Sequence, residues 1–296
     1  MVKQQAELTA EQLHRKKVIN RRIYVVVMQA LLIICSIIFI FPLFWMLSVS
    51  LQTQNEMLTS TGFWDQLIPN SWRFMNYVDV FTVIPFLRYF RNSVIITVAC
   101  VVGTVASSSI VAYAFSRLRW PGRGLCFNIM LTTIMLPSFV LLVPTYRMYS
   151  MVGLTETWFP LILPSFLGGG ASNVLLIQQF YNTVPQELSE SAKIDGAGHF
   201  RIWWSIMLPL CKPVIATVAI FTFLFTWNDF LNPLIYVHDS RLYTVALGIR
   251  AFQTKSGTEW GYLMAASVIS IVPVMLVFTF AQRYFVEGIK MTGLKA

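Results

Sequence analysis

Six stretches of this chain are nearly free of charged residues, and each is long enough to cross a lipid bilayer as a helix. Five of them contain no Asp, Glu, Lys or Arg, and the other contains only Asp229. Because an α-helix rises 1.5 Å per residue, about 20 residues cross a hydrocarbon core about 30 Å thick. The main solvent of this protein is therefore expected to be lipid. The stretches cover residues 23–55, 92–116, 124–146, 157–186, 213–237 and 260–282.

The overall composition agrees with a membrane protein and excludes two other classes. Of the 296 residues, 56% are hydrophobic and 12% are charged, whereas a soluble domain carries about 25% charged residues. A disordered chain and an ordinary cytosolic enzyme are therefore excluded. Lipid cannot satisfy the backbone of open strands, and the alternation of a lipid-facing barrel is absent. The predicted fold class is an all-α membrane protein with six transmembrane helices.

The distribution of basic residues predicts the orientation of these helices. With the N-terminus in the cytoplasm, the inside segments hold fifteen Lys and Arg residues and the outside segments hold seven. This excess favours an N-in, C-in topology, with residues 1–22 and 283–296 as cytoplasmic ends. The first apolar stretch is too long for a signal-peptide core, so we interpret it as an uncleaved span. The net charge of +9 is mainly a topology signal, and no nucleic-acid partner is expected.

Two features predict structure other than straight spans. Residues 72–87, inside the first region at 23–87, are aromatic and apolar but too short to cross the membrane, and they predict an interfacial helix. Proline and glycine predict broken helices in the third and fourth spans. Such breaks often line a transport cavity, but ordinary membrane packing also tolerates them, and both interpretations stay open. The residues concerned are Pro137, Pro144, Pro160, Pro164 and Gly168–Gly170.

The sequence holds no cluster that suggests catalysis or a metal site. Four cysteines are dispersed along the chain, three histidines are isolated, and neither set has a metal-binding spacing. No GxxxxGKS/T loop is present, so ATP hydrolysis by a P-loop is not expected. A membrane enzyme would need a clustered nucleophile, base or set of metal ligands. We therefore predict neither enzymatic activity nor a bound metal.

The segment between the fourth and fifth spans, residues 183–212, predicts two short helices on the cytoplasmic side. Residues 187–194 suit the first helix and residues 199–207 the second, with an apolar face on the latter. Between them, Gly196 and Gly198 suit a tight turn. A compact hairpin of this kind can fit a groove on a partner protein. An inert cytoplasmic loop is the alternative interpretation.

This segment also resembles a motif of known transporters. Its spaced acidic, small and apolar residues are similar to the E-A-A---G---------I-x-L-P loop of binding-protein-dependent ABC importer permeases. The middle alanine of that loop is replaced by a serine, which is also small. The matching residues are Glu190-Ser191-Ala192, Gly196 and Ile206-x-Leu208-Pro209.

Further likeness extends over nearly the whole chain and points to carbohydrate permeases of the maltose-permease type. Residues 194–197, 227–230 and 288–295 resemble that subgroup. The resemblance implies a type I ABC importer permease fold with a shared transport domain at residues 88–282. It also implies four partner chains in the cytoplasmic membrane of a bacterium: a second homologous permease, two ATPase subunits, and an extracytoplasmic sugar-binding protein. The ATPase subunits would bind ATP and Mg, and this chain would hold no cofactor.

The resemblance assigns the hairpin at 183–212 to coupling with an ATPase subunit. Glu190 would pair with a basic group in a cleft of that subunit, and Ala192 and Gly196 would allow close approach. The tail would contact the ATPase subunits through Gly293 and Lys295, with a frayed terminus as the alternative. The residues implied in coupling are Glu187, Glu190, Ser191, Ala192, Asp195, Gly196, Ile206, Leu208 and Pro209.

A polar group in the fifth span is a candidate for the translocation path. It consists of Trp227, Asn228, Asp229 and Asn232. Ionisable residues at membrane depth are candidates for function. For Asp229 we favour a structural role, capping the end of the span or bonding a neighbouring helix, because the resembling permeases share these residues across different sugars.

The loop at residues 238–260 is a candidate contact for the binding protein. In the maltose-type subgroup the corresponding loop contacts the binding protein, while an ordinary surface loop remains the alternative. The residues are Gln253, Thr254, Lys255, Ser256 and Gly257.

The runner-up function is an ion-coupled secondary transporter of a small polar solute. Such a protein would need paired carboxylates within the membrane or an inverted repeat. Among the intramembrane positions only Asp229 qualifies, and no internal repeat is evident. The sequence therefore favours the permease subunit of an ATP-driven sugar importer.

Overall fold

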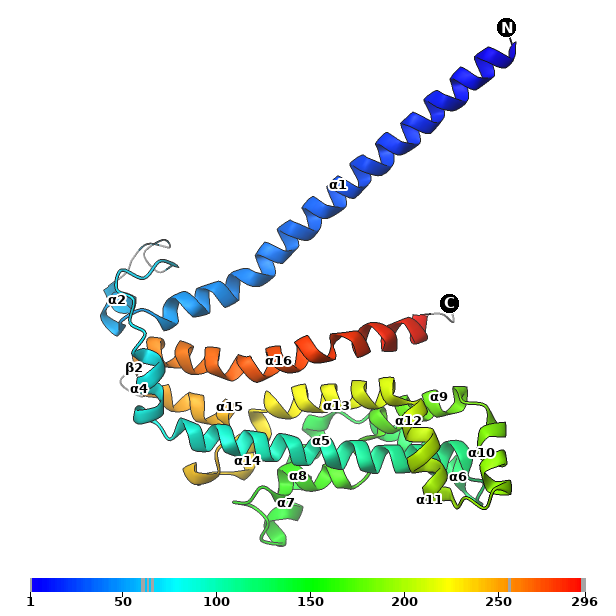
Figure 1. The fold of residues 1–296 in the computed structure, drawn as a ribbon. Helices are drawn as coiled ribbons and strands as arrows, with labels where there is room; N and C mark the ends of the chain where they lie inside the picture. The colour runs from blue at the N-terminus through cyan, green and yellow to red at the C-terminus, as the bar shows by residue number, and fades with distance from the viewer. Residues whose placement is uncertain (1, 60–61, 63, 65–66, 255–256, 294–296) are drawn as a thin grey trace.

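The computed structural model describes residues 2–59, 62, 64, 67–254 and 257–293, and these residues are largely helical (Figure 1). The strands among them form one two-stranded sheet, so the all-α prediction is confirmed. The first helix, α1 (Val2–Ser50), has 49 residues and extends away from the rest of the protein. It packs on α16 (Trp260–Gly293), the last helix, near its own C-terminal end.

Four segments in the described part of the chain are long and apolar enough to cross a membrane as they stand. Two further pairs of helices pass the same test together, each bent at a short break, so the number reaches six if each pair is one span. The single segments are Arg21–Ser50, Phe86–Arg117, Phe159–Thr183 and Trp260–Gln282, and the bent pairs are Arg123–Ile134 with Ser138–Met151 and His199–Leu210 with Lys212–Trp227.

The predicted breaks in the third and fourth spans are present. Helices α6 (Arg123–Ile134) and α7 (Ser138–Met151) meet at 104°, with Pro137 in an extended conformation just before α7. Helices α8 (Phe159–Phe166) and α9 (Ala171–Thr183) are separated by residues 168–170, three glycines that all have positive φ. Left-handed backbone at consecutive positions is accessible to glycine at little cost.

The fifth span differs from the expected stretch at 213–237. Helix α13 (Lys212–Trp227) ends before Asp229, and a separate short helix, α14 (Leu231–Tyr236), follows it. The break has a local cause, because the Asp229 carboxylate accepts hydrogen bonds from the backbone and side chain of Asn232. At its other end α13 meets the preceding helices at 84°, at Cys211.

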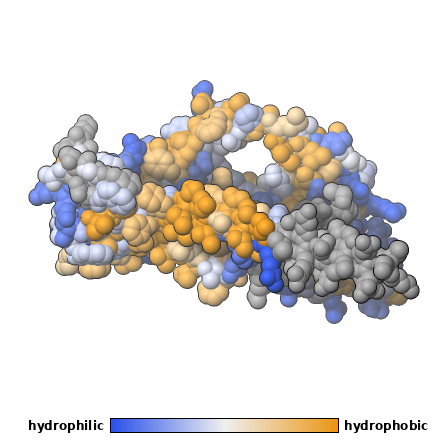
Figure 2. All heavy atoms as spheres, turned by 90° about the horizontal axis from the view of Figure 1, so that it is seen from above, coloured by the Kyte–Doolittle hydropathy of each residue, from blue (hydrophilic) through white to orange (hydrophobic). Residues whose placement is uncertain are grey.

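Helix α5 (Phe86–Arg117) lies at the centre of the bundle and packs against α8, α9 and α13. Small residues on its buried face, such as Gly103, Ser108 and Ala112, let these neighbours approach closely. Elsewhere the protein exposes much apolar side-chain surface, which Figure 2 shows on one face. Exposed apolar area of this extent is expected where lipid or a partner chain provides the cover.

The end of the molecule opposite the hairpin is built from short elements, and we call it the α4 end (Figure 1). The predicted interfacial helix is shorter than expected, because Pro85 holds Ile84 in an extended conformation and ends α4. The elements are α2 (Gln54–Thr59), α4 (Asn76–Val83), η2 (Ser240–Leu242), α15 (Val245–Gly248), η3 (Ile249–Phe252), β1 (Gln253–Thr254) and β2 (Gly257–Thr258).

Candidate functional site

The two helices predicted for residues 183–212 are present and form a hairpin at one end of the molecule (Figure 1). The first is α10 (Gln186–Ile194). The second begins as α11 (His199–Ile202), continues as a π-helical turn at Trp203–Met207 and ends as α12 (Leu208–Leu210). Single π-helical turns often occur at functional positions.

Gly196 forms the turn between the two helices of the hairpin. Its φ is +77°, its N–H donates to the carbonyl of Lys193, and the next N–H, of Ala197, donates to the carbonyl of Ala192. This pair of bonds is a Schellman motif, which ends a helix on a left-handed residue. Among the described residues, and apart from its two chain neighbours, no group lies within 4 Å of a Cβ built on Gly196. The backbone conformation, rather than crowding within this chain, therefore explains the glycine.

The inner face of the second hairpin helix is part of the protein core. Ile202 and Met207 are fully buried, in one cluster with Tyr113 of α5 and Tyr181 of α9. The Tyr113 hydroxyl lies 3.1 Å from Nδ1 of His199. At the start of the hairpin, the Arg117 guanidinium donates to the carbonyls of Tyr181 and Val184. The hairpin is therefore fixed to α5 and α9.

The outer face of the hairpin is exposed and both acidic and apolar. Ile194 is 87% exposed at the tip, and Leu188 and Phe200 are also exposed. The motif did not single out these three apolar residues. The predicted coupling residues divide into two groups: Glu187, Glu190, Ser191, Asp195, Gly196 and Pro209 are exposed, whereas Ala192, Ile206 and Leu208 are half-buried.

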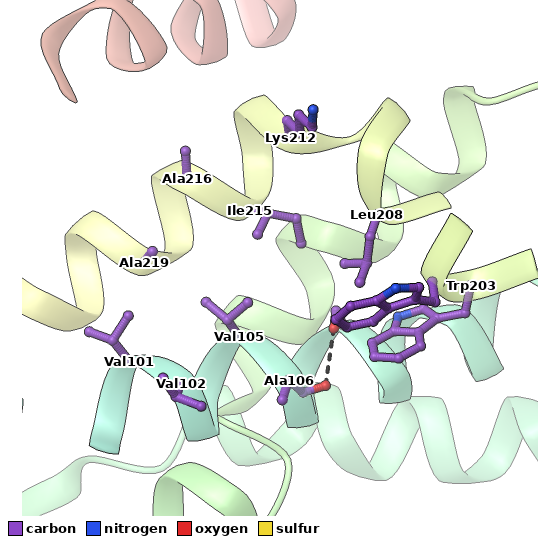
Figure 3. Close-up of a pocket in the computed structure, with 12 residues that line it drawn as sticks. Val101, Val102, Val105, Ala106, Trp203, Leu208, Lys212, Ile215, Ala216 and Ala219 are labelled. Carbon is purple, nitrogen blue, oxygen red and sulfur yellow. Dashed lines mark hydrogen bonds between the residues drawn. The ribbon is translucent and has the colours of Figure 1, made fainter. Parts of the chain in front are cut away.

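An apolar groove of 520 Å³ lies beside the hairpin, between α5 and α13 (Figure 3). Val101, Val105 and Ile215 form its walls, Trp203 lies at one end, and Lys212 is at the rim. The hydroxyl of Ser109 is bonded to the carbonyl of Ala106. The groove offers few groups that could bind a polar solute.

A larger cavity of 840 Å³ lies between α5, α8, α13 and the start of α9. Its size is within the range of small-molecule sites, about 300–1,000 Å³. Asp229 and Asn232 of the predicted polar group line it. Most of the other polar lining was not predicted from the sequence, although the glycine break at 168–170 is a signal that points to it. The missed polar residues include Thr104, Ser172, Asn173, Thr222, Thr226 and Thr244.

The other two members of the predicted polar group do not line the cavity. Trp227 is buried, its indole N–H donates to the carbonyl of Ser270 at 3.0 Å, and its ring contacts Phe90. The Asn228 amide donates to the carbonyl of Leu224 in its own helix. The structure therefore separates Trp227 and Asn228, which donate to backbone carbonyls, from Asp229 and Asn232, which line the cavity.

The candidate loop for a binding protein lies at the α4 end, opposite the hairpin (Figure 1). Gln253 and Thr254 pair with Thr258 and Gly257 in a two-stranded sheet, and the side chain of Gln54 bonds the carbonyl of Thr258. Lys255 and Ser256 lie outside the described residues. Of the tail candidates, Gly293 is the last residue of α16 and Lys295 lies outside the described residues.

The carboxylate of Glu156 links the segment before α8 to the segment after α14. Glu156, with φ of 61°, accepts hydrogen bonds from the backbone N–H groups of His238 and Asp239 and contacts Nδ1 of His238. These donors, the His238 N–H first, hold the pKa of the Glu156 carboxyl below its ordinary value. The contact fixes a loop next to helix α14.

The hairpin and most of the cavity lining lie in a segment that matches a known family. The sequence profile of the binding-protein-dependent transport system inner membrane component family matches residues 104–291. The chain belongs to this family. Its members are inner-membrane transport components, so the predictions of a membrane permease subunit and of a non-enzymatic role are confirmed, and the ion-coupled alternative is set aside.

Curated relatives match most of the chain. The diacetylchitobiose uptake system permease protein NgcG of Streptomyces coelicolor is 34% identical, over 88% of this chain and 86% of its own length. The arabinooligosaccharides transport system permease protein AraQ of Halalkalibacterium halodurans is 32% identical over 88% and 92%. The sn-glycerol-3-phosphate transport system permease protein UgpE of Agrobacterium fabrum is 31% identical over 92% and 98%.

Solved structures show the same fold. A chain of a bacterial ABC transporter involved in the import of the acidic polysaccharide alginate superimposes with a TM-score of 0.79, at 22% identity, covering 89% of this chain and 97% of that one. A chain of an alginate ABC transporter in complex with an alginate pentasaccharide-bound periplasmic protein gives a TM-score of 0.64 at 18% identity, covering 90% and 94%. The predicted ABC importer permease fold is thus confirmed.

Proposed function

We propose that this chain is one of two permease subunits of an ATP-driven importer that carries a sugar across the cytoplasmic membrane of a bacterium. The chain would cross the membrane six times, with both ends in the cytoplasm. Two ATPase subunits would bind ATP and Mg, and an extracytoplasmic sugar-binding protein would deliver the substrate at the α4 end.

The substrates in the relatives' names support a carbohydrate. Diacetylchitobiose, arabinooligosaccharides and alginate are carbohydrates, and sn-glycerol-3-phosphate is a polyol phosphate. The cavity suits such solutes, because hydroxyl and amide side chains can bond sugar hydroxyls, and exposed Phe221 and Phe225 offer apolar faces for a ring.

The observation that carries the proposal is the direct connection between the hairpin and the cavity. The second hairpin helix is buried against α5 and α9, and it leads at Cys211 into α13. Helices α5, α9 and α13 also line the cavity. A displacement of the hairpin would therefore move cavity walls as part of a rigid body, which is how a bistable transporter responds to a ligand bound elsewhere.

In this proposal the exposed face of the hairpin binds a cleft of one ATPase subunit. Glu190 would pair with a basic group there, and the exposed apolar side chains of Leu188, Ile194 and Phe200 would fill the cleft. When ATP binding closes the ATPase dimer, the two hairpins of the permease pair would shift. The cavity would then switch from inward-facing to outward-facing.

Substitution of Gly196 by proline tests the coupling role. Proline fixes φ near −65°, which is incompatible with the φ of +77° at Gly196. In proteoliposomes holding the whole complex, we expect Gly196→Pro to keep ATP hydrolysis and to lose sugar uptake. Gly198→Ala is the matched control, because Gly198 has an ordinary φ of −71° and open space around its Cα. Wild-type uptake by the Gly196→Pro complex would falsify the coupling assignment.

The energy source is tested separately. Uptake should persist when the proton gradient is collapsed and ATP is supplied inside the vesicles. It should stop when ATP is replaced by a non-hydrolysable analogue. Uptake that followed the proton gradient instead would restore the ion-coupled alternative.

A further inference from the structure

The lining of the 840 Å³ cavity carries one charged side chain, Asp229, and it holds no Lys, Arg or His. All of the lining residues belong to the described part of the chain. The remaining polar lining consists of hydroxyl, thiol, amide and backbone groups. A solute in this cavity would therefore meet a single negative charge and no positive one.

The position of the Asp229 carboxylate is fixed. Its two oxygens accept from the backbone N–H of Asn232 at 3.2 Å and from the Asn232 amide at 2.8 Å. The side chain thus bonds the start of α14 and at the same time lines the cavity. A fixed charge in a partly desolvated site acts more strongly on a solute than one in water.

The same face of α13 offers surface suited to an uncharged sugar. Phe221, Thr222, Phe225 and Thr226 line the cavity ahead of Asp229, at spacings that place them along one side of the helix. Phe225 is 73% exposed. Alternating aromatic and hydroxyl groups match the apolar ring faces and the hydroxyls of a sugar.

We propose that Asp229 is a specificity-determining residue that restricts this subunit's route to uncharged sugars and excludes sugars bearing a carboxylate or phosphate. This inference rests on the proposed function. An anionic solute brought into the cavity would need a cation to compensate for its lost hydration, and here it meets a carboxylate instead. Rejection by a repulsive group leaves the binding of a neutral solute unaffected.

The charge of the cavity can be measured without knowing the substrate. In a complex whose native cysteines in this chain are replaced, Thr226→Cys would be modified with a cationic and an anionic methanethiosulfonate reagent. The rate at which each reagent modifies the introduced cysteine is divided by the rate at which the same reagent modifies a small free thiol in solution. We expect the cationic reagent to be favoured about tenfold or more, and Asp229→Asn to remove most of that preference while keeping an acceptor for the Asn232 N–H.

Asp239→Asn is the matched control, because it removes a carboxylate that pairs with Arg241 and does not line the cavity. It should leave the ratio of rates unchanged. Equal rates for the two reagents, or a preference that survives Asp229→Asn, would overturn the proposal.

The second measurement is ATP-dependent uptake by the intact complex with its own binding protein. The probes are neutral oligosaccharides and their uronate- and phosphate-bearing counterparts. Uptake confined to neutral sugars supports the inference. Uptake of an anionic sugar would refute it and leave the proposed function standing, whereas a complex that imports no sugar would refute the proposed function, and the reagent ratio would still decide the charge of the cavity.

Discussion

The hydroxyl of Tyr113 and Nδ1 of His199 lie 3.1 Å apart, and this contact joins α5 to the first residue of the second hairpin helix. The two rings also meet edge to face, with centroids 6.2 Å apart. Because α5 lines the cavity and the hairpin is the proposed contact for the ATPase, this pair lies on the path between them.

The first prediction concerns this hydrogen bond. Tyr113→Phe keeps the ring and removes the hydroxyl, so it should destabilise the protein by about 1 kcal/mol. We also expect fewer sugars transported per ATP hydrolysed. The measurements are thermal unfolding in detergent and the uptake-to-hydrolysis ratio in proteoliposomes. Tyr146→Phe, on α7, is the control and should change neither, while an unchanged ratio in Tyr113→Phe would argue against a role in coupling.

The second prediction concerns Arg117, whose guanidinium bonds the carbonyls of Tyr181 and Val184 at the end of α9. Arg117→Met leaves both carbonyls without this donor and should cost about 2–3 kcal/mol of stability. Arg119→Met, two residues along on the exposed surface, should stay within about 0.5 kcal/mol of the wild type. Equal melting temperatures for the two variants would show that the bonds at Arg117 contribute little.

The third prediction distinguishes two neighbouring glycines. A Cβ at Gly169 would lie 2.7 Å from the carbonyl oxygen of Thr104 in α5, whereas in the part of the chain that the structure describes no group beyond the chain neighbours lies within 4 Å of a Cβ at Gly168. Both have positive φ, so each alanine variant should lose about 1–2 kcal/mol from backbone strain. Gly169→Ala should lose more, because α5 must also move away. Thermal unfolding of the two variants gives the comparison, and a smaller loss at Gly169 would contradict it.

The fourth prediction concerns acid. The donors around Glu156 lower the pKa of its carboxyl from the ordinary value of 4.5. A carboxyl with a lowered pKa in the folded state stabilises the protein above the unfolded-state pKa, and this contribution is lost as pH falls through the folded-state value. Glu156→Gln should therefore melt below the wild type at neutral pH, and the difference should shrink below about pH 4.5. A difference in melting temperature that does not change with pH would show that the lowered pKa of Glu156 is not its cause.

The sequence predicted the hairpin well because its signals are local. Gly196 marks the left-handed turn, and the flanking residues have helical propensity, so both helices could be placed, although the second ends at Leu210, beyond the predicted residue 207. The breaks at Pro137 and at Gly168–Gly170 were predicted for the same reason. The coupling roles of the hairpin residues remain predictions.

Features that depend on contacts between distant residues could not be predicted in this way. The separation of Trp227 from Asp229 depends on a bond to Ser270 in α16. The polar lining of the cavity comes from helices α5, α8, α9, α13 and α14 and from Asp229 and Thr244 between helices. The burial of Cys211, at the 84° bend, in one cluster with Tyr113 of α5 and Tyr181 of α9 is another contact of this kind.

The exposure of the first helix, α1, affects how stable the subunit is in the cell. Nothing in the most apolar window of Arg21–Ser50 is buried, while the amide of Asn76 holds the carbonyls of Ser50 and Gln52 at its foot. The direction of this helical segment, about 45 Å long, is thus set near its C-terminal end, by these hydrogen bonds and by packing on α16. In a chain synthesised without its partner subunits, this apolar helix would lack protein contacts, and the quality-control proteases of the cell would degrade the chain. The abundance of this subunit should therefore depend on the abundance of its partner subunits.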